Sequence, residues 1–158
     1  LKILFFMKAI GIIPARFGSS RFPGKPLALI NGISMIQRVY MQVSKANSLQ
    51  KVLVATDNIQ IFEHVAAFGG EVIMTSPNIN NGTERCLAAL NLYELQNSEI
   101  NFKIIVNIQG DEPFIAPEEI NTLVNCFADK NVEISTNKEV DISNFTIERA
   151  TWHGPCFI

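Results

Sequence analysis

Basic side chains, serines and glycines gather in one short stretch near the start of the chain. The stretch reads IIPARFGSSRFPGKPL (12–27) and follows directly on an apolar run. Its positive charge comes from Arg16, Arg21 and Lys25. Gly18 and Gly24 let backbone N–H groups approach an anion, so this loop is suited to hold a triphosphate. Such charge matters most when pyrophosphate leaves, because negative charge then grows on the leaving group. The plain alternative is a solvated basic turn.

Two familiar phosphate-binding motifs do not account for this loop. A Rossmann dinucleotide site requires G-x-G-x-x-G just after the first strand, and the chain has no such pattern there. A P-loop requires G-x-x-x-x-G-K-[ST], but Gly18 and Gly24 are one residue too far apart. Pro26 also stands where the magnesium-binding hydroxyl of a P-loop would be. The sequence therefore predicts a phosphate-binding loop that is neither a Rossmann motif nor a P-loop.

A second group of polar residues lies in NIQGDEP (107–113), at the end of another apolar run. It contains Gln109, Asp111 and Glu112. A carboxylate at the end of a buried strand, facing a triphosphate, is suited to Mg²⁺, which takes one or two carboxylates together with phosphate oxygens. Taken alone, the segment also reads as an ordinary turn marked by Gly-Asp and Glu-Pro.

A third group lies in NGTERC (81–86). Arg85 stands one turn into a predicted helix, and a helix N-terminus can receive a polar ligand. The alternative is a capped surface helix that carries an exposed arginine.

Strands and helices alternate along the chain. Apolar runs predict strands at 8–13, 51–56, 71–75, 103–110 and 132–135. Apolar residues at helical spacing predict helices at 34–46, 59–68, 80–95 and 116–128. Pro14 is expected to close the first strand, and Ser34 to cap the first helix. The alternation implies βαβ units with a parallel sheet that is covered on both faces.

The parallel sheet explains how the loops that follow three of its strands would meet. In such sheets, ligands gather beyond the carboxyl ends of the strands, where the strand order reverses. We therefore expect the loop 14–26, Asp57 and the loop 109–113 to lie at one edge of the sheet.

Composition narrows the function classes. A chain of 158 residues that is 47% hydrophobic and 18% charged is typical of one soluble globular domain. Its net charge of -2 provides no general attraction to nucleic acid or to a membrane, so the basic loop is a local site feature. The three cysteines, Cys86, Cys126 and Cys156, are widely spaced and form no metal-ligand pattern, which favours reduced thiols in the cytosol.

The three motifs together resemble the cytidylyltransferases that activate 3-deoxy-D-manno-octulosonate (Kdo). The matching stretches are IIPARFGSSRFPGKPL, INGISMIQRV, VLVATDN, GGEVIMTSPNINNGTERC and VNIQGDEPFI. The first stretch is shared in looser form with other sugar nucleotidyltransferases, whereas NNGTERC together with VNIQGDEPFI is more specific to the Kdo family. The resemblance runs from about Met7 to about Thr136.

The resemblance implies a three-layer α/β/α nucleotidyltransferase fold, Rossmann-like and of the nucleotide-diphospho-sugar transferase type, with a mostly parallel sheet in truncated form. It also implies the reaction of CTP with Kdo to give CMP-Kdo and pyrophosphate, with Mg²⁺ as the cofactor. The reaction belongs to lipopolysaccharide biosynthesis in the cytoplasm. Family members form homodimers, and the resemblance implies neither a nucleic-acid nor a membrane partner.

The resemblance also implies roles for individual residues. Arg16, Arg21 and Lys25 would hold the triphosphate as the catalytic residues, with Lys25 closest to the developing charge. Asp111 would bind Mg²⁺. The implied nucleotide-binding residues are Arg16, Ser19, Lys25, Gly82, Thr83, Arg85, Gln109 and Asp111.

The resemblance divides the chain into parts. Residues 7–136 are expected to form the nucleotide-binding part of a cytidylyltransferase domain, and residues 1–6 to lie upstream of the natural start. Residues 137–158 are expected to be a divergent tail, with the sugar-acid pocket and the dimer strands in a second half that this sequence lacks. A frameshift or premature stop in a longer gene would explain this. An inactive remnant that binds CTP, and a nucleotidyltransferase acting on another sugar acid, stay open as alternatives.

Overall fold

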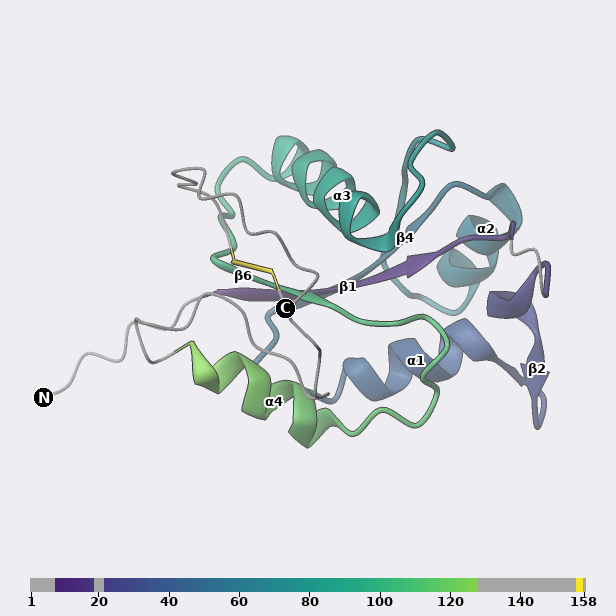
Figure 1. Ribbon diagram of the computed structural model, residues 1–158, viewed down its shortest axis with the longest axis horizontal. Coiled ribbons are helices and arrows are strands. Elements are labelled where there is room, and N and C mark those ends of the chain that lie inside the picture. The colour runs from purple at the N-terminus through teal and green to yellow at the C-terminus, as the bar shows by residue number, and fades with distance from the viewer. Residues whose placement is uncertain (1–7, 19–21, 128–155, 158) are drawn as a thin grey trace, which may run out of the picture.

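The fold is a central sheet between two layers of helices (Figure 1). It was established from a computed structural model, which describes residues 8–18, 22–127 and 156–157. The predicted strand at 132–135 lies outside the described residues. So does most of the predicted tail.

The central sheet is parallel, and its strand order is β5-β4-β1-β6-β7. Its strands are β1 (Ala9–Ala15), β4 (Lys51–Thr56), β5 (Val72–Met74), β6 (Ile104–Asn107) and β7 (Cys156–Phe157). In the register of β1, Ile10 lies between Lys51 and Ile105. After β1 the chain fills one side of the sheet with β4 and β5, and then places β6 on the other side of β1. The strand order therefore reverses between β1 and β6.

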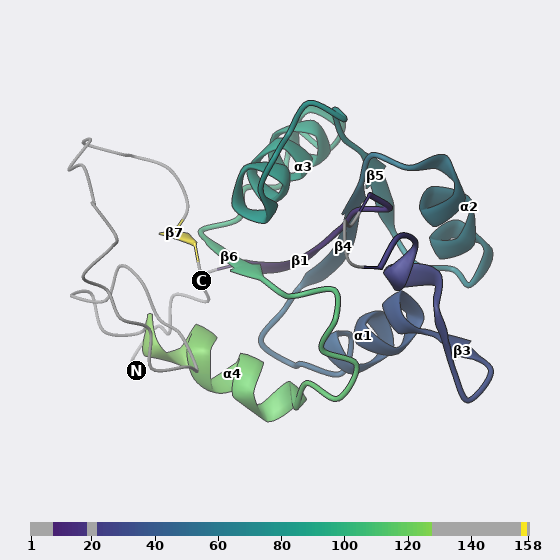
Figure 2. The ribbon, with the colours of Figure 1, turned by 45° about the vertical axis from the view of Figure 1, so that its right-hand side comes forward.

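Four α-helices among the described residues cover the two faces of this sheet. They are α1 (Met35–Val43), α2 (Ile59–Ala67), α3 (Gly82–Gln96) and α4 (Pro117–Cys126). In Figure 2, α3 lies above the sheet, and α1 and α4 lie below it. The buried side chains of α2 belong to the same core as those of α1 and α4, whereas α3 has a separate core on the other face. This confirms the predicted three-layer α/β/α fold.

The strand β1 shows why apolar runs predicted this sheet. Ile10 and Ile12 pack against α3, while Ala9 and Ile13 face the core of the other three helices. All of these side chains are fully buried. A parallel strand that is covered on both faces reads as a continuous apolar run rather than as an alternating one.

The predicted end of the first strand is wrong. Pro14 does not close β1, because the strand continues to Ala15. The carbonyl of Ile12 accepts a hydrogen bond from the N–H of Ile108, so Pro14, two residues later, turns its nitrogen to the same side. Pairing between β1 and β6 ends at Ile12, whereas pairing with β4 continues to Ala15. The missing N–H of Pro14 therefore removes no bond from the sheet.

A small hairpin was not predicted. A 3-10 helix, η1 (Lys25–Leu27), leads into β2 (Leu29–Ile30) and β3 (Ile33–Ser34), which pair antiparallel. Asn31 and Gly32 join the two strands with φ values of 49° and 77°. An Asn-Gly dipeptide between apolar residues is the sequence signal that predicts such a turn. Directly after the hairpin, Ser34 caps α1 as predicted, its side chain accepting a hydrogen bond from Gln37 N–H.

Candidate active site

A pocket of about 460 Å³ opens at the carboxyl ends of β1 and β6, where the strand order reverses. It lies at the position where ligands bind in open parallel sheets. The predicted site residues that line it are Arg16, Lys25, Gly82, Gln109 and Asp111. The structure therefore brings residues of all three sequence motifs to one place.

Two glycines allow the three motifs to approach one another. A Cβ atom at Gly110 would lie 3.0 Å from the carbonyl oxygen of Pro14, and one at Gly82 would lie 3.3 Å from Cγ of the same proline. The turn after β6 and the first residue of α3 thus both pack on the end of β1. A side chain at Gly110 would push the turn away from β1, because the atom that it meets belongs to the backbone.

Lys25 and Asp111 form an ion pair across the pocket. Lys25 Nζ donates to Asp111 Oδ2 at 2.6 Å, and the two side chains are 38% and 49% exposed. Lys25 lies in η1, and Asp111 lies in the turn that follows β6. The sequence predicted both residues in the site but not their contact, which joins positions far apart in the chain.

Arg16 also lines the pocket. It directly follows β1, and its side chain reaches the segment before α3. Its Nη1 donates to the backbone oxygen of Asn80 at 2.6 Å. The orientation of this exposed guanidinium is therefore set by the backbone of a neighbouring loop. Asn80 is a site residue that the sequence analysis missed, because a backbone acceptor leaves no signal in residue type.

Arg85 does not line the pocket. Its side chain is fully buried, and its Nη2 donates to Asp57 Oδ2 at 2.7 Å. Its Nη1 donates to the hydroxyl of Thr75. The alternative of an exposed arginine on a surface helix is therefore wrong. A carboxylate and polar groups inside the fold accept hydrogen bonds from both terminal nitrogens of the guanidinium, while its Nε has no partner among the described residues. Asp57, expected at the same sheet edge as the phosphate loops, is the partner of Arg85 and does not line the pocket.

Of the remaining predicted site residues, Thr83 is described by the structure, and Ser19 and Arg21 are not. Thr83 lies at the start of α3, where its Oγ1 accepts a hydrogen bond from Asn107 Nδ2 at 3.5 Å, and it does not line the pocket. Asn81 caps the same helix by accepting from Glu84 N–H at 2.8 Å.

Asp111 is the candidate ligand for a metal ion. Among the described residues, no group of three or more His, Cys, Asp or Glu side chains lies close enough to hold a metal by itself. Mg²⁺ does not require such a cage, since it binds through one or two carboxylates and the phosphates of a substrate. A carboxylate on the wall of a pocket lined by basic residues fits this requirement.

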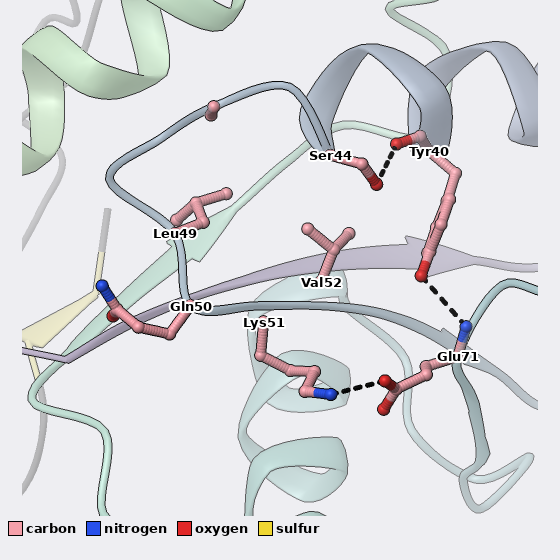
Figure 3. A pocket seen from close by; sticks show the side chains of 8 residues that line it. Tyr40, Ser44, Leu49, Gln50, Lys51, Val52 and Glu71 are labelled. Carbon is pink, nitrogen blue, oxygen red and sulfur yellow. Dashed lines mark hydrogen bonds and ion pairs between the residues drawn. The ribbon is translucent and has the colours of Figure 1, made fainter.

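A second pocket, of about 220 Å³, lies at the opposite end of β4 (Figure 3). Its lining includes Tyr40, Lys51 and Glu71, and none of the predicted site residues. Lys51 pairs with Glu71, and this hydrogen bond raises the pKa of Lys51 above its usual value. Glu71 N–H donates to the hydroxyl of Tyr40 at 3.1 Å. Lys51 is the one basic residue in the described lining of this pocket, whereas both Arg16 and Lys25 line the larger pocket, so the larger pocket is better suited to a triphosphate.

No helix in the part of the chain that the structure describes is long and apolar enough to cross a bilayer.

Comparisons with known proteins agree with the motifs. A 3-deoxy-manno-octulosonate cytidylyltransferase of Parabacteroides distasonis is 56% identical over 130 residues, which cover 82% of this chain and 49% of that protein. An 8-amino-3,8-dideoxy-manno-octulosonate cytidylyltransferase of a Shewanella species is 49% identical over 121 residues, covering 77% of this chain and 48% of that protein. The solved structure of CMP:2-keto-3-deoxy-manno-octonic acid synthetase complexed with CTP has a TM-score of 0.68 and 42% identity, covering 79% of this chain and 49% of that one.

The chain thus spans about half the length of the relatives it matches. The sequence model of the cytidylyltransferase family matches residues 10–150, a range that runs past Thr136. On the strength of this match and of the identities above, the chain belongs to the cytidylyltransferase family.

Proposed function

We propose that this chain supplies the nucleotide-binding part of a cytoplasmic enzyme that transfers CMP from CTP to Kdo, with release of pyrophosphate, for lipopolysaccharide biosynthesis. The observation that carries the proposal is the pocket between β1 and β6, which gathers Arg16, Lys25, Gln109 and Asp111. The 56% identity to a Kdo cytidylyltransferase supports the choice of nucleotide and acceptor.

The basic residues would hold the triphosphate. Arg16 and Lys25 provide positive charge on the pocket wall, and Arg21 would add to it from the same loop. Gly18 and Gly82 expose backbone to the pocket without side chains that would block an anion. Since negative charge grows on pyrophosphate as it leaves, fixed positive charge at Lys25 would lower the barrier to the transfer.

The pair between Lys25 and Asp111 suggests how these residues serve the nucleotide. A triphosphate offers Lys25 a second anionic partner, and the Asp111 carboxylate is then available to hold Mg²⁺. When bound, Mg²⁺ supplies charge neutralisation on the phosphates. The protein groups would contribute by positioning the nucleotide and stabilising charge, with no covalent intermediate.

A second candidate acceptor is 8-amino-3,8-dideoxy-manno-octulosonate. Relatives that carry this substrate in their names are 49% identical to the chain, close to the values of several Kdo relatives. Both acceptors are sugar acids of the same carbon skeleton, and they differ at the substituent on carbon 8.

The test is pyrophosphate release by the purified chain with CTP, Mg²⁺ and either acceptor, together with calorimetric titration of CTP. We expect CTP to bind, and Asp111→Ala to abolish the magnesium-dependent part of binding and any release. Glu63→Ala, which removes an exposed carboxylate on α2, is the control and should change neither. Binding without release would leave nucleotide binding as the chain's own activity. A folded chain that does not bind CTP would contradict the proposal.

A further inference from the structure

We propose that Asp57 and Arg85 are positioning residues for the pocket: their buried ion pair fixes the segment 75–81, and this segment in turn orients Arg16. The inference rests on the proposed function, because it assigns the pair a part in holding the nucleotide. Neither residue lines the pocket, so the effect would pass through the loop that lies between them and Arg16.

The pair lies inside the fold and outside the lining of the pocket. Asp57 directly follows β4, and Arg85 lies in the first turns of α3. The Asp57 side chain is 14% exposed, and that of Arg85 is fully buried. A guanidinium removed from water is stable only when its charge is paired, so Asp57 determines where Arg85 can lie.

The guanidinium of Arg85 also binds the segment between β5 and α3. Nη1 donates to the hydroxyl of Thr75 and, at 3.4 Å, to the carbonyl of Ser76, and Nη2 donates to the carbonyl of Ile79 at 3.0 Å. Thr75 is itself held by Thr56, whose carbonyl accepts from Thr75 Oγ1 at 3.1 Å. The segment has no strand or helix of its own. Thr75 N–H donates to the Thr56 carbonyl and Ile79 N–H to the Ser76 carbonyl, and the bonds from Arg85 add to these two backbone bonds.

The same segment carries the contact to the pocket. Asn80 follows Ile79 directly, and its carbonyl accepts the hydrogen bond from Arg16 Nη1 at 2.6 Å. Gly82, two residues further on, lines the pocket wall. A chain of contacts therefore runs from Asp57 through Arg85 and the loop backbone to Arg16.

The first test compares CTP affinity in two charge-matched variants. Asp57→Asn keeps the size of the side chain and removes the charge that holds Arg85. We expect it to weaken CTP binding by about tenfold, since losing one hydrogen bond to a charged group lowers affinity by about this factor. Glu71→Gln breaks an ion pair to Lys51 at the other end of β4 and should change the affinity by less than about twofold.

The second test asks whether Asp57 acts through Arg16. In an Arg16→Ala background, Asp57→Asn should weaken CTP binding by less than about twofold, because the group that it positions is already gone. Equal losses in both backgrounds would mean that Asp57 acts only on general stability, and would overturn the inference. Unchanged affinity of Asp57→Asn in the native background would overturn it as well.

A readout that does not need the nucleotide separates this inference from the proposed function. Deuterium uptake of the backbone amides in 76–81 should rise in Asp57→Asn and stay unchanged in Glu71→Gln. If the native chain binds no CTP, the proposed function fails, whereas selective exchange in this segment still supports the fixing of the loop. Unchanged deuterium exchange in Asp57→Asn would overturn the inference that the ion pair fixes this segment.

A pair of variants at Thr75 covers the case in which Asp57→Asn does not fold. Thr75→Val removes the hydroxyl that accepts from Arg85 while keeping the side-chain shape, and Thr75→Ser retains the hydroxyl. We expect Thr75→Val to raise deuterium exchange in 76–81 and to weaken CTP binding. Thr75→Ser should keep both the exchange and the affinity close to those of the native chain. Equal behaviour of the two variants would contradict a role for this hydrogen bond.

Discussion

At the scale of single residues, the charged pair in the pocket contributes little to stability. Lys25 and Asp111 are paired, but both side chains are substantially exposed. Exposed ion pairs contribute little to folding, because water screens the attraction and two long side chains lose freedom. The pair formed by Asp57 and Arg85 is different, since it is buried and each partner depends on the other.

This contrast predicts the behaviour of Asp111→Asn. We expect its free energy of unfolding to change by less than about 0.5 kcal/mol, because the lost pair is exposed. Urea denaturation measures this change. Magnesium-dependent CTP binding, measured by titration with and without the metal, should be lost in the same variant. A fall in stability of about 2 kcal/mol or more would instead assign Asp111 a structural role.

Cys86 predicts a pH dependence of stability. Burial raises the pKa of its thiol to about 12 from an ordinary value of 9.0, and the charge of Arg85 offsets only part of this rise. Above pH 9 the unfolded thiol loses its proton while the folded one keeps it, so the unfolded state is favoured as pH rises. The stabilisation that comes from the protonated Cys86 thiol is fully present below pH 9.0 and is lost as the pH rises towards 12. Over this range the free energy of unfolding falls by about 1.4 kcal/mol per pH unit.

The measurement is the free energy of unfolding at about pH 8 and about pH 10, in the native chain and in Cys86→Ala. The variant should show a smaller decline over this interval, since it has no thiol to deprotonate at this site. Lys51, whose pKa is also raised, loses stabilisation in the same direction and is retained in both proteins. Parallel declines would show that Cys86 does not titrate differently in the two states.

Residue types predicted which residues share a pocket better than they predicted the contacts between them. Arg16, Lys25, Gln109 and Asp111 line one pocket, as expected from their places after β1 and β6. The family resemblance implied a place for Arg85 in the nucleotide pocket, whereas the structure buries its side chain against Asp57. Whether an arginine faces a pocket or an interior carboxylate depends on packing, which the type of residue does not encode.

At the scale of elements, the hairpin β2–β3 depends on its two-residue turn. Both Asn31 and Gly32 have positive φ, a conformation that strains a residue with a Cβ atom. Nothing lies within 4 Å of a Cβ atom built on Gly32, so only the backbone conformation limits this position.

We therefore expect Gly32→Ala to lower the free energy of unfolding by about 1 kcal/mol. Asn31→Gly is the matched control: it retains access to positive φ and should leave stability unchanged or lose only a few tenths of a kcal/mol. Chemical denaturation of the two variants tests this. Equal stability of Gly32→Ala and the native chain would show that the hairpin carries no strain at this turn.

Elements with long buried runs were predictable, and short ones were not. The sequence predicted four strands of the central sheet and the four helices near their observed positions. Each of them has an apolar run or a helical period that can be recognised in the sequence. The four strands are β1, β4, β5 and β6. The hairpin strands have only two residues each, too few to show a period. β6 ends at Asn107 rather than at residue 110, because the chain turns there and Glu112 N–H bonds the carbonyl of Gln109.

At the scale of the whole molecule, the pocket exists because β6 returns to the side of β1 opposite to β4. This arrangement brings the turn after β6 against the end of β1. Gly110 is the contact point, since a Cβ atom there would lie 3.0 Å from the Pro14 carbonyl oxygen.

Gly110→Ala should therefore weaken both the fold and the pocket. We expect a loss of about 2 kcal/mol in unfolding free energy, because neither backbone can yield without moving a strand end. CTP affinity should fall with it, since Gln109 and Asp111 flank the displaced residue. Gly18→Ala is the control for stability, as nothing lies within 4 Å of its Cβ position. A Gly110→Ala chain as stable as the native one would show that the two loops separate at no cost.

The sequence alone determined the alternation of strands and helices, the parallel three-layer fold, the three polar motifs and the family. These properties depend on local patterns, because burial on both faces makes a strand uniformly apolar and a buried stripe gives a helix its period. Only the tertiary structure decided which polar groups meet. Lys25 and Asp111 are 86 positions apart, and Asp57 and Arg85 are 28 apart. Such contacts depend on strand order and packing, so they arise only when the sheet is assembled.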